Sequence, residues 1–489
     1  MAVKLVIRDE VNIKLENLPL DARKKLTNTF KYVDPTARYR PAYKLGRWDG
    51  SVTTFGLGGN GYLSQLEKIL EVLGTMNISI DEVADERRPI DIKFEKVGER
   101  YWADKGKVWP KGHPQEGEPI MLRDYQIEAI NLFLENPQSL QELATGAGKT
   151  ITTATMCHLV EPYGRSIVIV PNKSLVEQTE EDFVNVGLDV GVYYGDRKDL
   201  NKTHTICTWQ SLNILDKKSK NWDSETALTL AEFLDGVQTV IVDEVHMAKA
   251  EVLKNLLTQN LCNCPIRWGM TGTVPKDQHE YELIFASIGP VVGGISAKEL
   301  QDKGVLSDCH VSIAQLIDLK EFKSYPEELK YLVTDKERMD YISKLIKKIS
   351  QSGNTLVLVN RIDTGKHLTE TLEDAVFISG AVKTTDRKAE YDEIKTSDDK
   401  IIVATYGVAA VGINIPRIFN LVLLEPGKSF VRVIQSIGRG IRKAKDKDFV
   451  QIWDITSTCK FAKRHLTARK KFYKDAKYPF TVEKVDWQK

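Results

Sequence analysis

The chain has 489 residues, of which 42% are hydrophobic and 28% charged, a composition typical of a soluble globular protein with about two to four domains. No window approaches the roughly 18 apolar residues of a membrane span, and the N-terminus has no apolar signal-peptide core, so we expect a cytoplasmic protein without a membrane partner. The formal net charge is only +1. Of the six cysteines, only Cys262 and Cys264 lie close together in the sequence, and no second pair near them completes a zinc site.

Residues 1–97 are predicted to form a small α/β domain. The stretch KLVIRDEVNIKL (4–15) alternates apolar and charged residues like a strand, and SQLEKILEVLGTMNISI (64–80) is typical of an amphipathic helix that leads into a strand. The polar stretch from about Gly98 to Pro119, rich in Pro and Gly, is interpreted as a linker or extended arm.

Within this domain, FKYVDPTARYRPAYKLGRWDGSVTTF (30–55) mixes aromatic with basic residues. Aromatic rings stack on nucleic-acid bases while arginines hold phosphates, which makes this stretch a candidate DNA-binding surface. An ordinary small domain with half-buried rings and solvated arginines explains the pattern equally well. The candidate residues are Arg38, Arg40, Arg47 and Trp48.

From residue 121 onward, short β-branched runs alternate with helical patterns, which predicts parallel sheets covered on both faces. The pattern starts again after about Ser296, so two successive α/β domains are expected, at 98–295 and 296–489. The expected strands lie at 166–170, 203–207, 238–244, 266–272, 354–360, 375–379, 400–405, 420–425 and 449–455.

The segment LATGAGKT (143–150) lies between an apolar-leaning run and a helix-compatible run, which is the context of a phosphate-binding loop. Glycines let backbone N–H groups surround phosphate oxygens, and the helix N-terminus adds partial positive charge. Lys149 is expected to reach the β- and γ-phosphates, and the Thr150 hydroxyl to bind Mg²⁺. The strict pattern requires glycine at position 143, where this chain has Leu143.

A second motif, VIVDEVH (240–246), is an apolar strand that ends in two acids about a hundred residues later. Asp243 is expected to hold Mg²⁺, directly or through water, and Glu244 to orient or deprotonate the attacking water. Together with the phosphate loop, this motif predicts hydrolysis of a nucleoside triphosphate.

Between about residues 120 and 455 the motifs resemble, in their order, those of the superfamily-two helicases. LRDYQIEAI (122–130) is similar to the adenine-reading element of that family, although an amphipathic helix start explains RDYQ equally well. The resemblance implies two tandem RecA-like motor domains of the α/β class, with ATP and Mg²⁺ as cofactors. The implied nucleotide-binding residues are Arg123, Tyr125, Gln126, Ala144, Thr145, Gly146, Ala147, Gly148, Lys149 and Thr150.

Further short motifs resemble those that bind the nucleic-acid backbone in this family or that couple nucleic-acid binding to hydrolysis. IVPNKSLVEQ (169–178) and TWQSL (208–212) are similar to the backbone-gripping motifs, and MTGT (270–273) to the coupling motif, whose hydroxyls are expected to sense the acidic motif through His246. The implied DNA-binding residues are Pro171, Asn172, Thr208, Gln210, Arg361 and Thr405, and the implied coupling residues are His246, Thr271 and Thr273.

In the second half, QSIGRGIRK (435–443) fits the family's Q-x-x-G-R-x-x-R pattern, and ATYGVAAVGINIP (404–416) resembles the motif that touches both nucleotide and DNA. Many relatives have Asp where this chain has Asn414. The resemblance implies that Gln435, Arg439 and Arg442 take part in hydrolysis, the two arginines as fingers that stabilise the transferring phosphoryl. A basic DNA-facing or solvated helix is the alternative.

The small N-terminal domain with its LGRWDG segment (45–50) extends the resemblance to nearly the whole chain, toward the phage UvsW-type helicases. This resemblance implies unwinding or branch migration of forked or four-way DNA, with contact to single-stranded DNA, 3′-to-5′ movement, and a role in recombination, replication and repair. A duplex translocase that separates no strands ranks second, and an RNA helicase third.

The C-terminal stretch is strongly basic, with 17 Lys/Arg against 6 Asp/Glu in residues 428–489. A polyanion partner and a solvated charged surface account for this excess equally well. Within it, KFAKRHLTARKKFYKDAKYPF (460–480) is a candidate contact with duplex DNA, and a helix packed on the second motor domain is the alternative.

Overall fold

The computed structural model describes residues 2–489 except 112, 114, 221–227, 248–249, 276, 373–374, 379–396, 409–416, 430–432, 434–435, 439 and 443–445. The chain forms two compact units. Unit 1 comprises Met1–Leu143 and Gly148–Gly294, and unit 2 comprises Ala144–Ala147 and Ile295–Lys489. The expected boundary between residues 97 and 98 stays a prediction. Among the described residues, no helix combines the length and apolar character needed to cross a lipid bilayer.

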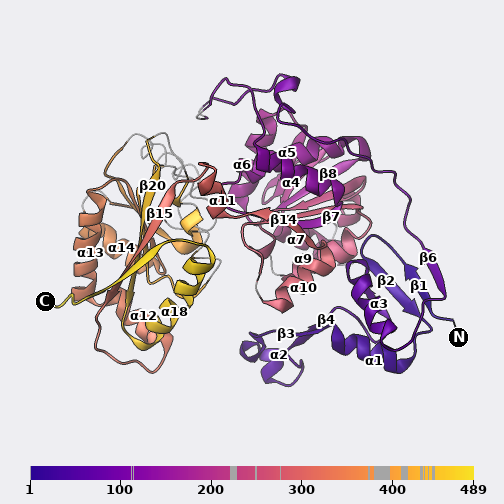
Figure 1. Ribbon diagram of the computed structural model, residues 1–489, viewed down its shortest axis with the longest axis horizontal. Helices are drawn as coiled ribbons and strands as arrows, with labels where there is room; N and C mark the ends of the chain where they lie inside the picture. The colour runs from indigo at the N-terminus through magenta and orange to yellow at the C-terminus, as the bar shows by residue number, and fades with distance from the viewer. Residues whose placement is uncertain are drawn as a thin grey trace. The chain divides into compact units, whose positions relative to one another are not determined.

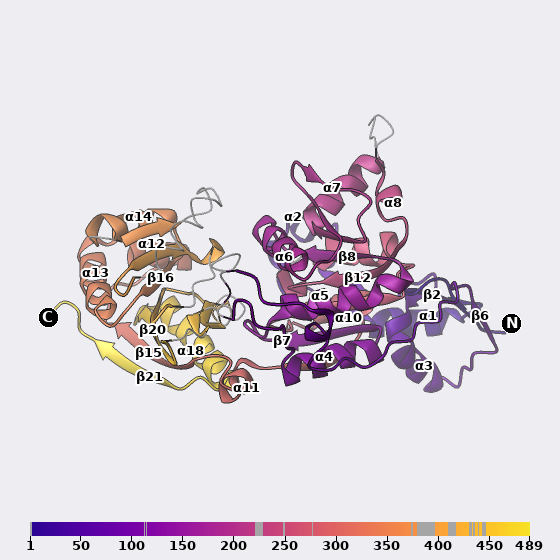
Figure 2. The ribbon, with the colours of Figure 1, turned by 90° about the horizontal axis from the view of Figure 1, so that it is seen from above.

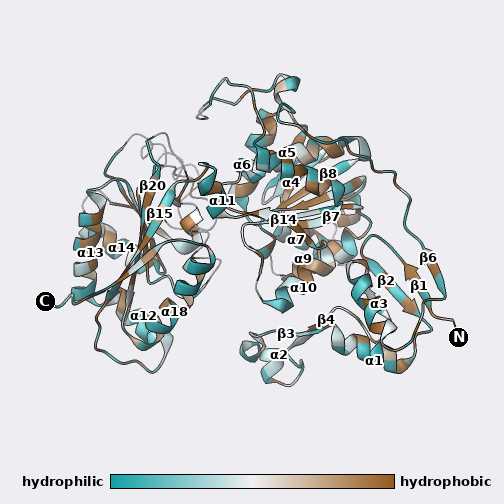
Figure 3. Cartoon of the chain, in the orientation of Figure 1, coloured by the Kyte–Doolittle hydropathy of each residue, from teal (hydrophilic) through white to brown (hydrophobic). Residues whose placement is uncertain are grey.

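Unit 1 contains an eight-stranded sheet in the order β10-β9-β11-β8-β12-β13-β7-β14. Its central strands are runs of buried residues that pair in parallel, as the apolar runs of the sequence predict. Figure 3 shows these central strands as brown, apolar ribbons, whereas polar residues lie on the outer helices. The strands are β7 (Gln138–Leu143), β8 (Arg165–Val170), β9 (Val190–Tyr194), β10 (Arg197–Lys198), β11 (His204–Thr208), β12 (Val237–Val242), β13 (Ile266–Thr271) and β14 (Val291–Ile295).

Helices cover both faces of this sheet, because the parallel crossovers carry helices, except the one from β9 to β11, which passes through β10. In Figure 1, α4, α5 and α6 lie on one face, and α7, α9 and α10 on the other. The helices are α4 (Asp124–Glu135), α5 (Lys149–Val160), α6 (Lys173–Asn185), α7 (Trp209–Ser219), α8 (Leu230–Phe233), α9 (Ala250–Asn255) and α10 (Gln278–Ser287), with a π-helical turn at Leu256–Asn260 and short 3₁₀ turns at Glu161–Tyr163 and Val245–Met247.

The N-terminal part of unit 1 forms a second, four-stranded sheet in the order β5-β2-β1-β6 and a β3-β4 hairpin. It packs on α10, where the buried carboxylate of Glu282 accepts a hydrogen bond of 3.2 Å from Gln65. The elements are β1 (Lys4–Ile7), β2 (Asn12–Glu16), α1 (Leu20–Thr29), β3 (Lys31–Val33), α2 (Pro41–Lys44), β4 (Ser51–Thr53), β5 (Asn60–Tyr62), α3 (Leu66–Gly74) and β6 (Glu82–Asp85), with 3₁₀ turns at Ala37–Tyr39 and Leu63–Gln65.

Two local predictions need correction. The strand after α3 begins at Glu82 rather than within residues 77–80, because the chain turns at Asn77 with a positive φ of 54°. The stretch 98–119 is not merely a linker. Trp102 is fully buried, and its indole N–H donates to the Thr155 hydroxyl of α5 at 2.8 Å, next to a 3₁₀ turn at Ala103–Lys105.

Unit 2 contains a seven-stranded sheet in the order β17-β18-β16-β19-β20-β15-β21, and all its strand pairs are parallel. Figures 1 and 2 show α13 and α14 on one face and α18 on the other. The elements are α11 (Ala297–Asp302), β15 (Asp308–Leu316), α12 (Tyr325–Thr334), α13 (Lys336–Ser350), β16 (Thr355–Val359), α14 (Ile362–Thr371), β17 (Ala375–Ile378), β18 (Ile401–Thr405), β19 (Asn420–Leu424), β20 (Phe449–Ser457), α18 (Lys460–Asp475) and β21 (Phe480–Val485). The predicted α/β class with parallel-sheet domains is therefore confirmed.

Candidate nucleotide-binding and nucleic-acid-binding site

The predicted phosphate loop lies between β7, which ends at Leu143, and α5, which begins at Lys149. Gly148 has a left-handed backbone, with φ of 79°. A Cβ atom at this position would lie only 2.4 Å from Nε2 of Gln126. Both observations explain why the position holds glycine, the residue that adopts this conformation without a side-chain penalty.

The predicted adenine-reading residues lie at the start of α4, beside this loop. Gln126 Oε1 accepts a hydrogen bond of 2.9 Å from the backbone N–H of Arg123, and an Arg123 guanidinium N–H donates to the Tyr125 hydroxyl at 2.9 Å. Tyr125 and Gln126 are both buried. Gln126 therefore closes the first turn of α4, as a helix start predicts, and its side chain also approaches Gly148. Its role in reading adenine stays a prediction.

The acidic motif lies at the carboxyl end of β12, in contact with the loop lysine. Lys149 Nζ donates to Glu244 Oε1 and lies 3.5 Å from Asp243 Oδ1. Burial raises the pKa of Asp243, and the carboxylate of Glu244 raises it further, whereas Lys149 opposes both effects. Lys149 thus contacts two carboxylates at once. The lysine and the two acids lie together at the place where the sequence predicts that the phosphates and the metal bind.

Glu244 and His246 connect the acidic motif to β13. The imidazole Nδ1 of His246 lies 2.5 Å from the Thr271 hydroxyl and 3.5 Å from Glu244 Oε2. The backbone N–H of Gly272 also donates to Glu244 Oε2, at 3.4 Å. Burial lowers the pKa of His246, so the imidazole is neutral at pH 7. The Thr271 hydroxyl hydrogen-bonds in turn to the carbonyl of Thr273, at 2.9 Å. The predicted coupling residues therefore lie together.

Glu244 also has a left-handed backbone, with φ of 49°, which is uncommon for a residue with a side chain. Such a conformation costs on the order of 1–3 kcal/mol and persists only where surrounding contacts fix it. The contacts with Lys149 and Gly272 supply that fixation. No feature of the sequence predicted this backbone conformation.

The predicted backbone-gripping residues of unit 1 come together at the carboxyl ends of the neighbouring strands β8 and β11. The Gln210 side chain donates to the Pro171 carbonyl at 3.2 Å. Asn172 caps α6 through Leu175 N–H at 3.1 Å, and Thr208 caps α7 through Ser211 N–H at 3.2 Å. Two helix N-termini therefore lie at this edge, and helix N-termini favour phosphate groups.

In unit 2, Arg361 follows β16, and Thr405 is the last residue of the adjacent strand β18. Both therefore lie at the carboxyl edge of the parallel sheet. Arg442 is half-buried, and its backbone bridges to Leu306. Gln435, Arg439 and the segment 409–416 with Asn414 lie outside the described residues.

The N-terminal candidates differ in exposure. The Arg40 guanidinium forms an ion pair of 2.8 Å with Asp34 and lies 5.3 Å from the centroid of the Trp48 ring. The two predicted DNA-binding residues Arg40 and Trp48 therefore contact each other. Arg38 and Arg47 are exposed. Two further rings of the aromatic and basic stretch are exposed, those of Tyr39 (66%), over which the Arg38 guanidinium lies at 4.8 Å from the centroid, and Tyr43 (44%).

Comparison with known proteins gives two family matches. Residues 119–276 match the family "Type III restriction enzyme, res subunit", and residues 337–444 match "Helicase conserved C-terminal domain". These two ranges hold the phosphate loop, the acidic motif and the Q-x-x-G-R-x-x-R segment.

Individual relatives extend the similarity to most of the chain. The ATP-dependent DNA helicase uvsW of Enterobacteria phage T4 is 24% identical over 474 residues, which are 92% of this chain and 89% of the phage protein. A putative DNA 3′-5′ helicase Rad25 of Haloarcula marismortui is 26% identical over 349 residues, which are 68% of this chain and 52% of that protein.

Among solved structures, a fragment of a putative HsdR subunit of a type I restriction enzyme from Vibrio vulnificus YJ016 has a TM-score of 0.57 and 18% identity, and the match covers 97% of this chain and 85% of that one. This likeness shows a shared fold. The predicted tandem motor domains and the predicted resemblance to UvsW-type helicases are confirmed by these matches. These matches together indicate an ATP-dependent helicase that resembles UvsW and the superfamily-two helicases.

Proposed function

We propose that the protein unwinds or branch-migrates forked and four-way DNA, with 3′-to-5′ movement, in recombination, replication and repair. The observation that carries this proposal is the connected set in unit 1. Lys149 contacts both acids of the DEVH motif, and Glu244 leads through His246 to Thr271. A motor protein needs contacts that carry the change from ATP to ADP at the hydrolytic residues to other parts of the domain. The contact of His246 with Thr271 of β13 is such a connection. We place the protein in the cytoplasm, that of the host cell if a phage encodes it.

The phosphate loop and the residues around β12 and α4 fit ATP and Mg²⁺. We assign the phosphates to the loop 144–150, with Lys149 as their cation, and the adenine to Gln126 with Arg123 and Tyr125. Mg²⁺ binds through few protein oxygens and keeps waters and substrate phosphates, so Asp243 and Thr150 suffice as its protein ligands. In keeping with that, the described residues contain no group of three or more His, Cys, Asp or Glu side chains arranged as a metal site. Bound Mg²⁺ supplies neutralisation of phosphate charge.

The chain's own residues have separable roles in this proposal. Glu244 holds the attacking water and takes its proton. His246 and Thr271 transmit changes in the position of Glu244 to β13 through their hydrogen bond. Arg439 and Arg442 stabilise the charge of the transferring phosphoryl, a role that rests on the family motif.

We assign DNA-backbone contacts to Pro171, Asn172, Thr208 and Gln210 in unit 1, and to Arg361 and Thr405 in unit 2. The adjacency of Gln210 to Pro171, with two helix N-termini beside them, supports this assignment. At the N-terminal part, Arg38, Arg40, Arg47 and Trp48 contact DNA, and the exposed Tyr39 adds a stacking surface. The names of the relatives, a phage DNA helicase and an archaeal DNA 3′-5′ helicase, support DNA as substrate and the direction of movement.

Strand displacement on forked, nicked and four-way DNA, with matched RNA substrates, tests the proposal. We expect ATP-dependent separation of forked and four-way DNA that is absent from the Lys149→Ala variant. Separation that prefers RNA, or that continues without ATP, contradicts the proposal.

The alternative is a duplex translocase that separates no strands. The match to a restriction-enzyme subunit family and the likeness to an HsdR fragment favour it. Two readouts on one substrate distinguish the candidates. ATP turnover on unbranched duplex without strand release supports the translocase, whereas release from forks supports the helicase.

A further inference from the structure

Helix α18 carries a row of cations along one side, and all of them except the half-buried Lys470 are exposed. Its sequence, KFAKRHLTARKKFYKD, has one acidic residue, the final Asp475. The cations form two groups, 460–464 and 470–474, with Thr467 between them, and the spacings of three, four and seven positions across the two groups place them on one face of the helix. From the first to the last they span about 21 Å at 1.5 Å per residue. The α18 basic stripe consists of Lys460, Lys463, Arg464, Lys470, Lys471 and Lys474.

The opposite side of α18 fixes the direction in which this stripe points. Arg469, 1% exposed, donates two hydrogen bonds of 2.8 Å to Asp454 of β20, and the Tyr473 hydroxyl donates to the same carboxylate at 2.7 Å. Arg469 also donates to the Gly427 carbonyl at 2.7 Å. The helix cannot roll on the sheet without breaking these buried contacts, so the stripe stays exposed.

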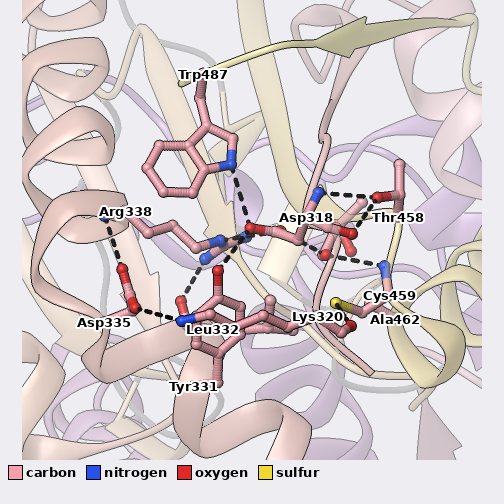
Figure 4. Close-up of polar contacts among 12 residues, drawn as sticks. Asp318, Lys320, Tyr331, Leu332, Asp335, Arg338, Thr458, Cys459, Ala462 and Trp487 are labelled. Atoms are coloured by element: carbon pink, nitrogen blue, oxygen red, sulfur yellow. Dashed lines mark hydrogen bonds and ion pairs between the residues drawn. The ribbon is translucent and has the colours of Figure 1, made fainter. Parts of the chain in front are cut away.

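The start of α18 is held by a buried polar network, shown in Figure 4. The Asp318 carboxylate accepts hydrogen bonds from Arg338, Tyr331 and Trp487, each at 3.2 Å. The Asp318 backbone N–H donates to the Thr458 hydroxyl at 2.9 Å. These bonds anchor the residues that directly precede α18.

A second buried acid completes the anchor. The Glu328 carboxylate accepts the backbone N–H groups of Phe461, at 3.0 Å, and Ala462, at 2.6 Å. Glu328 is fully buried, so its charge offsets the positive helix end and does not reach the surface. The cationic character of α18 therefore comes from its side chains alone.

The stripe begins at the carboxyl edge of the sheet, because α18 follows the end of β20. The same edge carries exposed Lys428 after β19, and Lys428 lies near enough to His465 of α18 to lower the pKa of that imidazole, together with burial and Arg469. Arg361 and Thr405 also lie at this edge. The stripe is thus continuous with the edge to which we assign DNA contacts.

We propose that the α18 basic stripe holds the phosphate backbone of a duplex arm of the substrate. The inference rests on the proposed function and names a surface for one arm. The ring of Phe461, beside the stripe, is half-buried and lies 5.8 Å from Lys460 Nζ and 6.0 Å from the Arg464 guanidinium, so the surface offers phosphates mainly charge. A straight, rigid row of cations matches a duplex backbone, whose charge is dense and regular.

A matched pair of charge-reduced variants tests this proposal. The test variant combines Lys463→Gln, Lys471→Gln and Lys474→Gln, and the control combines Lys336→Gln, Lys344→Gln and Lys348→Gln on α13, across the sheet. We expect the test variant to bind a duplex oligonucleotide about tenfold more weakly, with a salt slope lower by about 2–3, since each lost phosphate contact removes about 0.9. The control is expected to stay within about twofold of wild type. Both variants should retain the wild-type unfolding temperature and ATP turnover without DNA.

An equal affinity of the test variant and the control variant for duplex DNA would overturn the proposal. So does a loss for single-stranded DNA that equals or exceeds the loss for duplex. A wild-type protein that separates no strands, while the stripe variant still shows the expected loss on duplex, overturns the proposed helicase activity and leaves the stripe assignment standing.

Discussion

Replacing Gly148 with alanine tests the geometry of the nucleotide site. At φ of 79°, an alanine is strained by about 1–2 kcal/mol. Its Cβ would also lie 2.4 Å from Gln126 Nε2, so the end of this flexible side chain must shift, at a cost of at most the hydrogen bond from the Arg123 backbone N–H, roughly 1 kcal/mol. Because Gln126 is assigned to adenine, we expect ATP to bind up to about fivefold more weakly, since 1.4 kcal/mol corresponds to a factor of ten and the displaced amide contributes roughly 1 kcal/mol.

Gly106→Ala is the matched control for this variant. Gly106 also has a positive φ, of 71°, but an added Cβ would meet no atom within 4 Å. Both variants should lower the unfolding temperature through backbone strain, and only Gly148→Ala should weaken binding of a fluorescent ATP analogue. Wild-type ATP affinity in Gly148→Ala, or equal losses in both variants, would refute the placement of Gln126 at the nucleotide.

Three other variants probe separate parts of the chain. Arg267→Met should lower the free energy of unfolding by about 3 kcal/mol or more in chemical denaturation, because buried Arg267 donates to the carbonyls of Leu257, Leu261 and Ser287, and an unpaired buried acceptor costs about 1–3 kcal/mol. Arg442→Ala should abolish ATP hydrolysis while ATP binding persists; wild-type turnover would contradict the finger role. Burial raises the pKa of Glu425 to about 7, so the folded state binds more protons than the unfolded state between pH 4.5 and 7, and stability falls as pH rises through that window. In Glu425→Gln, the free energy of unfolding should fall by about 2–3 kcal/mol less between pH 5 and pH 7 than in wild type, as measured by chemical denaturation at the two pH values. An equal fall in both proteins would contradict this prediction.

The sheets could be predicted because central parallel strands are buried on both faces and appear as uninterrupted apolar runs, such as SIVIV in β8. The catalytic candidates could be predicted because Asp243 directly follows the apolar strand β12, and Lys149 begins α5 after the Gly-containing loop that follows β7. Their chemistry therefore has a local sequence signature at the point where each strand ends.

Features that depend on distant contacts could not be predicted. Trp102 lies in a stretch of Pro, Gly and charged residues, and only its contact with Thr155 shows that the stretch is anchored. The Arg338 guanidinium pairs with Asp318 and Glu425, 20 and 87 residues away, and buried charges are stable only when paired in this way. Nothing local distinguishes such residues from solvated charges.

The most direct test of the central claim is the rate of ATP hydrolysis with and without forked DNA, for wild type and Lys149→Ala. Lys149 is the cation that joins the phosphate loop to Asp243 and Glu244. We predict that forked DNA stimulates the wild-type rate and that Lys149→Ala, if folded by its unfolding temperature, is slower by about a hundredfold or more. A folded Lys149→Ala variant that hydrolyses ATP at the wild-type rate would contradict the account.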